Sequence, residues 1–509
     1  MLTDARVVAI ALMLAGSGAC AEAPLSAIDW LSHSLVTPVA LPAPAEPAIT
    51  KGALPEDVTT STLDQSSPDA IGVLAPQVTG LPRNLWGPGP AADIEALLTR
   101  QSAQDLPALQ GLLITLLLAE ADPPTDTTRN SLLLARIDKL LDIGALDQAR
   151  ALLDAAGPAT SPDLFRRYFD VSLLNGDENR ACSSLKDAPG LAPALPTRIF
   201  CLARSGDFDA AQLTLDTARA LGTLPPATAD LLDRFLDPSL DDSDQSPVVP
   251  NPVTPLDLRI FEAIGQPLPT ESLPLAFAHA DLSDHAGWKA QLAAAERLAR
   301  AGAIDPNMLL GLYTDQKPAA SGGVWDRVAT FQKLDSAIAS ADAGAVERAL
   351  PAAWSAMSQA ELEVPLAELY ADRLARIKLS GAAAETAFTI GLLSTDYRSA
   401  TSAPAPVIQR DAFLVGLTKG DLNGLIPPDS MARAIAPAFL SPVIPVDIQS
   451  LLDQNRTGEA ILTAMDQIAH GTAGDLRGVT DGLSVLRRIG LEDVARRTAL
   501  QLMLLDRRG

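Results

Sequence analysis

The sequence predicts an all-α fold, a solenoid of antiparallel helix pairs that follows an N-terminal extension. Of the 509 residues, 47% are hydrophobic but only 4% are aromatic. This balance favours closely packed helices over β-sandwiches, whose strands are rich in β-branched and aromatic residues. Short amphipathic helical patterns also alternate with single glycines over residues 130–222. Recurrence at a fixed interval indicates stacked helical units rather than one closed globular core.

The clearest unit is Cys201–Gly222, in which two amphipathic patterns are separated by Ser205-Gly206-Asp207. A glycine after a helical run suits the left-handed conformation that ends many helices. The aspartate that follows, or Asp209, can accept hydrogen bonds from the free amides of the next helix. Three apolar residues of that next helix share one face, at steps of four and three: Ala211, Leu215 and Ala218.

The same offsets recur upstream of this unit. Gly176 lies 30 residues before Gly206, and Gly144 lies 32 residues before Gly176. The small and apolar positions of these copies are Ala181, Leu185 and Ala188, and Ala149, Leu153 and Ala156. The pattern Gly-Asp-aromatic, with Ala five residues after Gly, resembles the second half of a tetratricopeptide (TPR) repeat. The first-half Trp and the closing Pro of typical TPRs are missing or displaced.

The TPR resemblance implies that the first helix of each pair faces a concave groove that binds a peptide or helix. In that register the exposed groove positions are Leu134, Asp138, Arg166, Asp170 and Phe200. The alternative is that these residues belong to ordinary solvated helix surface.

The amino terminus has the pattern of a secretory signal peptide over residues 1–21. Arg6 precedes an apolar run from Val7 to Ala15, and small residues then offer cleavage sites. Cys20 raises the alternative of a lipoprotein, but Ser17-Gly18-Ala19 before it differs from the usual lipid-attachment motif. We expect a periplasmic or secreted protein with no membrane span after cleavage.

Cys182 and Cys201 are the two cysteines that would remain in the mature chain. They lie on adjacent predicted helices, at nearly equal distances from a predicted turn at Pro189–Pro193. Antiparallel helices about that turn place the two residues opposite one another, so a disulfide is expected in an oxidising compartment. Two buried free thiols are the alternative.

Proline content divides the chain into segments. Residues 22–92 are rich in Pro, Ser, Thr and Asp and form an extended or disordered arm. This arm either lies along the solenoid as a strap or folds on a partner, with the region of Trp30 as a docking peptide. The remaining segments are a helical domain with the tandem repeats (93–237), a linker (238–256), a second helical domain (257–400), Pro-interrupted short helices (401–447) and C-terminal helix pairs (448–509).

The net charge of −23 argues against nucleic acid as a partner, because phosphate binding requires a basic surface. The main basic cluster comprises Arg487, Arg488, Arg496, Arg497, Arg507 and Arg508. It either pairs with nearby acidic side chains or forms a docking patch.

No pattern typical of catalysis or cofactor binding is present. The chain lacks Gly-x-Ser-x-Gly, His-Glu-x-x-His and a phosphate-cradling glycine loop. His279 and His285 are six residues apart, a spacing that does not share a helical face. We therefore expect no metal site, no cofactor and no enzymatic activity.

The expected function is a periplasmic protein–protein interaction scaffold. Its partner would be an envelope or motor protein, bound by the repeat groove or by the arm. The layout of signal, Pro-rich arm and helical repeats is similar to MotC-type periplasmic flagellar-motor accessory proteins, which implies a role in motility. The alternatives are a peptidoglycan-binding or cell-wall-synthesis regulatory protein and a passive secreted structural protein.

Overall fold

The computed structural model describes residues 67–102, 106–126, 130–237, 239, 246–402, 409–472 and 474–505. These residues form an all-α solenoid of antiparallel helix pairs, which confirms the predicted fold class. The described segments contain 23 α-helices and no strand, apart from a single parallel bridge between Leu74 and Ala119. In the same segments, no helix combines the length and the apolar character that a bilayer span requires.

Residues 67–90 lie along the solenoid, and the rest of the predicted arm is outside the described residues. Their anchor is Arg136, a fully buried side chain that donates to the carbonyl oxygens of Asp69, Ile71, Leu117 and Ala119. The Asp69 carboxylate in turn accepts from the backbone amide of Leu133 at 2.7 Å. The boundary at residue 92 was therefore too late, because the strap already belongs to the packed body. The strap contains α2 (Pro76–Thr79), and the helices that follow it are α3 (Ala91–Arg100) and α4 (Pro107–Leu118).

The predicted tandem repeats form three consecutive antiparallel pairs. Each pair turns at a predicted glycine with positive φ: Gly144 at 75°, Gly176 at 77° and Gly206 at 84°. Asp207 caps the last helix by accepting from the Ala210 amide. The helices are α5 (Ser131–Asp142), α6 (Leu146–Ala156), α7 (Pro162–Leu174), α8 (Glu178–Asp187), α9 (Leu195–Arg204) and α10 (Phe208–Ala220).

The chain then returns along the first helices of these pairs. After α11 (Pro226–Leu236), it forms α12 (Pro255–Ala263), η5 (Thr270–Ser272) and η6 (Leu275–Leu282). Helix α12 packs on α7 and α11, and η6 packs on α5 and α7. A capping box between Thr254 and Asp257 fixes the start of α12.

The next helices have their own hydrophobic cluster, from Ala278 to Leu393. They are α13 (Trp288–Arg300), α14 (Pro306–Asp315), α15 (Val324–Ala339), α16 (Ala343–Ser358), α17 (Glu363–Ala375) and α18 (Gly381–Leu393). The turn between α15 and α16 includes Ala341, whose φ is 52°.

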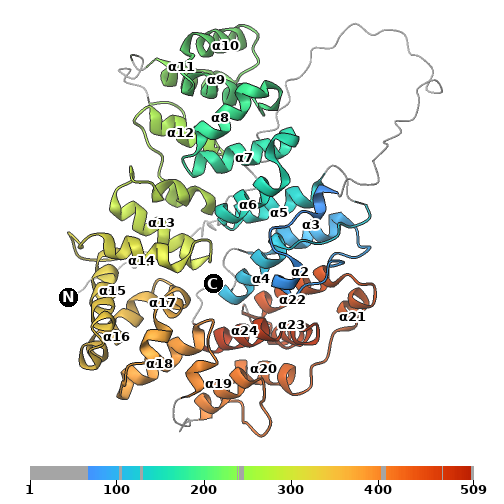
Figure 1. Ribbon diagram of the computed structural model, residues 1–509, viewed down its shortest axis with the longest axis vertical. Helices are drawn as coiled ribbons and strands as arrows, with labels where there is room; N and C mark the ends of the chain where they lie inside the picture. Colours follow the sequence, from blue (N-terminus) through green and yellow to red (C-terminus); the bar gives the residue numbers. More distant parts are fainter. Residues whose placement is uncertain are drawn as a thin grey trace, which may run out of the picture.

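The last helices bring the chain back to its described beginning (Figure 1). They are α19 (Gln409–Lys419), α20 (Ser430–Leu440), α21 (Val446–Asp453), α22 (Thr457–Thr472), α23 (Leu476–Arg488) and α24 (Glu492–Leu504). Helix α22 packs on α3, and α24 packs on α4. We call these two helix contacts, together with Leu85 and Trp86, the closing seam.

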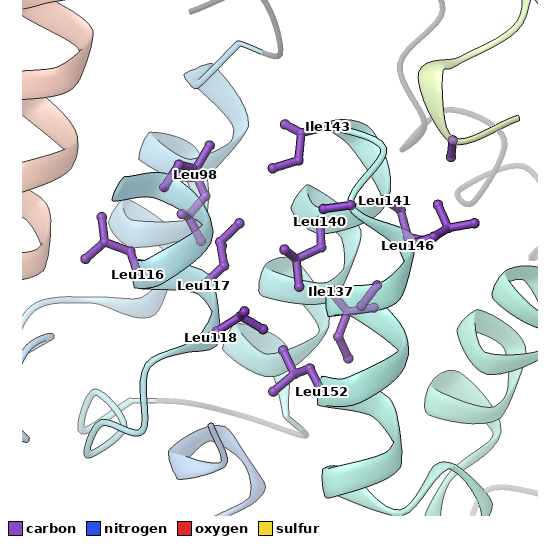
Figure 2. Packing of buried hydrophobic residues seen from close by; sticks show 14 of the residues in the cluster. Leu98, Leu116, Leu117, Leu118, Ile137, Leu140, Leu141, Ile143, Leu146 and Leu152 are labelled. Carbon is purple, nitrogen blue, oxygen red and sulfur yellow. The ribbon is translucent and has the colours of Figure 1, made fainter. Parts of the chain in front are cut away.

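The cores do not divide where the sequence suggested. One cluster runs from Leu81 to Ala280 and continues from Leu392 to Met503, so it includes helices on both sides of the predicted linker at 238–256. Figure 2 shows part of this cluster, where leucines of α3 and α4 approach those of α5 and α6. The linker is therefore a connection within one packed body and does not separate two cores.

Candidate binding surfaces

The predicted repeat groove is not an open surface. Leu134 and Asp138 are half-buried, while Arg166, Asp170 and Phe200 are buried, with exposed fractions of 5%, 8% and 2%. The prediction that these positions are exposed was wrong for the last three. The physical reason is long-range packing, since α11, α12 and η6 lie against the first helices of the repeats.

Four charged side chains form a cluster between α5 and α7, in which Arg166, Arg167 and Asp170 are buried and Asp138 is half-buried. Arg167 donates to both carboxylate oxygens of Asp138, at 2.5 and 2.6 Å. Burial lowers the pKa of Arg166, and the neighbouring Arg167 lowers it further. Burial also raises the pKa of Asp170 to about 7, although Arg166 and Arg167 act in the opposite direction. The Arg167–Asp138 ion pair therefore joins two helices, α5 and α7.

Phe200 belongs to an aromatic series that crosses the repeats. Its ring meets Phe169 edge-on at 6.4 Å and stacks on Phe235 of α11 at 5.4 Å. Phe169 in turn stacks on Phe165. Aromatic pairs of this kind stabilise a core, so Phe200 contributes to packing.

The two cysteines are paired as predicted. Cys182 of α8 and Cys201 of α9 form a disulfide with Cα atoms 5.0 Å apart. The bond joins the second helix of one pair to the first helix of the next, where both residues are buried.

A tryptophan cleft opens between the start of α13 and the start of α15. It has a volume of about 560 Å³ and is lined by Glu271, Gly287, Trp288, Lys289, Ala290, Ala293, Gln316, Ala319 and Trp325. The two indole rings are half-buried and tilted by 50°, with centroids 5.2 Å apart. The Trp288 Nε1–H donates to the Leu312 carbonyl at 2.9 Å, which fixes that ring. The sequence contained both tryptophans, but 37 residues separate them and only the packing of α13 against α15 brings them together.

A second exposed feature is the apolar connection from α20 to α21. Val443 and Val446 are 72% and 87% exposed, and Leu440 is about half exposed. Pro442 and Pro445 lie between them in the sequence. We call Leu440–Val446 the apolar edge. Prolines interrupted the helical pattern here, and this was the available signal of an irregular surface segment.

The remaining sequence candidates have local partners or lie outside the described residues. His279 is buried, with Nε2 at 2.7 Å from the Gly144 carbonyl, and burial lowers its pKa. Arg487 and Arg496 both pair with Glu492, and Arg497 pairs with Asp493. The cluster thus follows the ion-pairing alternative at these three positions. Trp30, the signal region, Arg507 and Arg508 are outside the described part of the chain.

Within the described ranges, no group of three or more Asp, Glu, His or Cys side chains is placed so that it could hold a metal ion. Comparison with known protein families, with curated proteins and with solved structures finds no match to this chain.

Proposed function

We propose that this protein is a non-catalytic periplasmic scaffold that binds a protein of an envelope complex. The observation that carries the proposal is the apolar edge, three large apolar side chains held in solvent within seven residues. Exposed apolar groups that are close together are typical of protein-binding surfaces. The prolines between them restrict the backbone, so less conformational entropy is lost when a partner binds.

The compartment is supported by two independent features. The amino-terminal residues have the pattern of a signal peptide, and a disulfide links two repeat units. Structural disulfides persist in oxidising compartments such as the periplasm. A role beside the flagellar motor is the narrower form of the proposal, and the layout of arm and helical repeats supports it.

The test is crosslinking in living cells followed by purification of the full chain. We expect one stoichiometric envelope protein, and its recovery should fall at least fivefold with Val443→Asp and Val446→Asp. The matched control is Leu213→Asp on α10, a similarly exposed leucine outside the apolar edge. Equal recovery with both variants would reject the apolar edge. Recovery of cell-wall fragments alone would favour the peptidoglycan-binding alternative.

A further inference from the structure

We propose that the tryptophan cleft binds a segment of this same chain, the proline-rich stretch Pro38–Pro47. The stretch reads Pro-Val-Ala-Leu-Pro-Ala-Pro-Ala-Glu-Pro and lies outside the described residues. This would make the cleft an intramolecular docking site for the arm. The proposal is independent of the apolar edge and of the envelope partner.

The chemistry of the cleft suits a proline-rich ligand. Because the Trp288 Nε1–H is already bonded to Leu312, that indole offers its apolar ring rather than a donor to a ligand. The lining also includes small side chains, Ala290, Ala293 and Ala319, which leave room beside the rings. Aromatic grooves of this kind bind polyproline II segments, in which proline rings pack on the aromatic faces.

The proposed occupant has matching properties. It contains four prolines in ten residues, and proline fixes φ near the polyproline II value, which lowers the entropy lost on binding. Its remaining residues are small or apolar except for Glu46. Lys289 at the rim of the cleft is exposed and can pair with this carboxylate. Glu271 also lines the cleft, and its negative charge disfavours a position of Glu46 beside it.

The tether is long enough to reach the cleft. The arm enters the described body at Ser67, beside Asp69 and its Arg136 anchor on α5. Helix α5 packs on η6, and η6 packs on α13, which carries Trp288. Three such steps span about 30 Å across the helices at interhelical distances of about 10 Å, to which displacement along the helix axes adds. The 20 residues from Pro47 to Ser67 can extend over about 66 Å.

The experiment measures the binding of a fluorescent peptide of residues 36–50 to full-length chains by anisotropy. In one chain the arm is disabled by Pro42→Ala, Pro44→Ala and Pro47→Ala, which vacates the cleft. We expect this chain to bind the peptide at least tenfold more tightly than the wild type, whose own arm competes. Adding Trp288→Ala and Trp325→Ala to the disabled chain should abolish binding.

Two further variants make the result independent of folding. In the chain with the disabled arm, Ala319→Arg places a bulky side chain on an exposed loop at the cleft. This substitution should weaken peptide binding at least tenfold without unfolding the chain. Trp354→Ala, a half-buried tryptophan of α16 outside the cleft, should leave binding unchanged.

The outcomes are distinct. Equal peptide affinity for the wild-type and the disabled chain would overturn the proposal, since an occupied cleft must compete. Failure of the peptide to bind would also overturn it, as would binding that is insensitive to Ala319→Arg. Binding of a cell-wall tetrasaccharide to the disabled chain in place of the peptide would assign the cleft to glycans.

Discussion

In the tandem repeats, α5–α10, each helix packs mainly on its neighbours in sequence, and the disulfide spans only 19 residues. In the closing seam, the partners are 361 to 393 residues apart. The Gln101 side chain donates to the Leu462 carbonyl, and the Ala108 amide donates to the Gln501 side chain. Both regions consist of packed helices, yet the contacts of one are local in sequence and those of the other join residues from opposite ends of the described chain.

The difference shows how a solenoid can become a closed body. A linear repeat array unfolds from its ends, because its terminal units have a neighbour on only one side. Here the two ends of the described chain lie against one another (Figure 1). Trp86 packs against Gly458 at this contact. A Cβ atom at residue 458 would lie 2.5 Å from the Trp86 ring, so only glycine allows this approach. We expect the closing seam to determine the stability of the whole body, and the contacts within α5–α10 to determine only the stability of those helices.

The largest effect should come from Trp86→Ala in the seam. Trp86 is 1% exposed, and truncating a buried aromatic side chain costs between about 3 and 5 kcal/mol. Denaturant unfolding measures the loss, and hydrogen exchange should show α3 and α22 losing protection before α5–α10. Leu213→Ala is the control, because this α10 side chain is exposed and its loss should change the free energy of unfolding by less than about 0.5 kcal/mol. Similar losses in both variants would contradict a controlling seam.

The next effect concerns the repeats. Cys182→Ser combined with Cys201→Ser should lower the free energy of unfolding by about 3 kcal/mol, because a loop of this length is no longer closed in the unfolded chain. Loss of hydrogen-exchange protection should be confined to α8–α10. If α3 and α22 lose protection equally, the two regions are coupled more tightly than their contacts indicate.

A somewhat smaller effect depends on pH. The pKa of Asp170 is about 7 in the folded protein and near 4 in the unfolded chain. Between these values the folded protein keeps the carboxyl proton and the unfolded chain does not, so protonation of Asp170 stabilises the folded state. The stabilisation is complete below about pH 4 and is lost as pH approaches 7. Relative to Asp170→Asn, the wild type should therefore lose about 2 to 3 kcal/mol between pH 5 and 8.

Thermal unfolding of both proteins across this pH range checks the prediction. Contributions from other groups, such as buried His279, are common to the two chains and cancel in the difference. A constant difference between pH 5 and 8 would show that Asp170 does not titrate in this range.

The smallest effect should be that of Asp93→Asn in the seam. Arg456 donates to Asp93 at 3.0 Å, but the Asp93 carboxylate is largely exposed. Exposed ion pairs contribute at most about 1 kcal/mol. A loss as large as that of Trp86→Ala, measured by denaturant unfolding, would mean that ion pairs rather than apolar packing hold the seam.

The sequence alone determined the local structure of this protein. A glycine that needs positive φ, followed by alanines and leucines at helical spacing, is sufficient to predict the hairpins at Gly144, Gly176 and Gly206. The same local geometry placed Cys182 opposite Cys201. These features depend on residues within one or two helices, and such short-range constraints are encoded in spacing.

Only the tertiary structure decided which helix faces are covered. Arg166, Asp170 and Phe200 were predicted to face a groove, yet later segments pack over the first helices and bury them. Trp86 looked like part of an arm and proved to be core, while Trp288 and Trp325 became neighbours through helix packing. Contacts between distant segments depend on how the whole chain curves, and no periodicity within a single helix specifies that curvature.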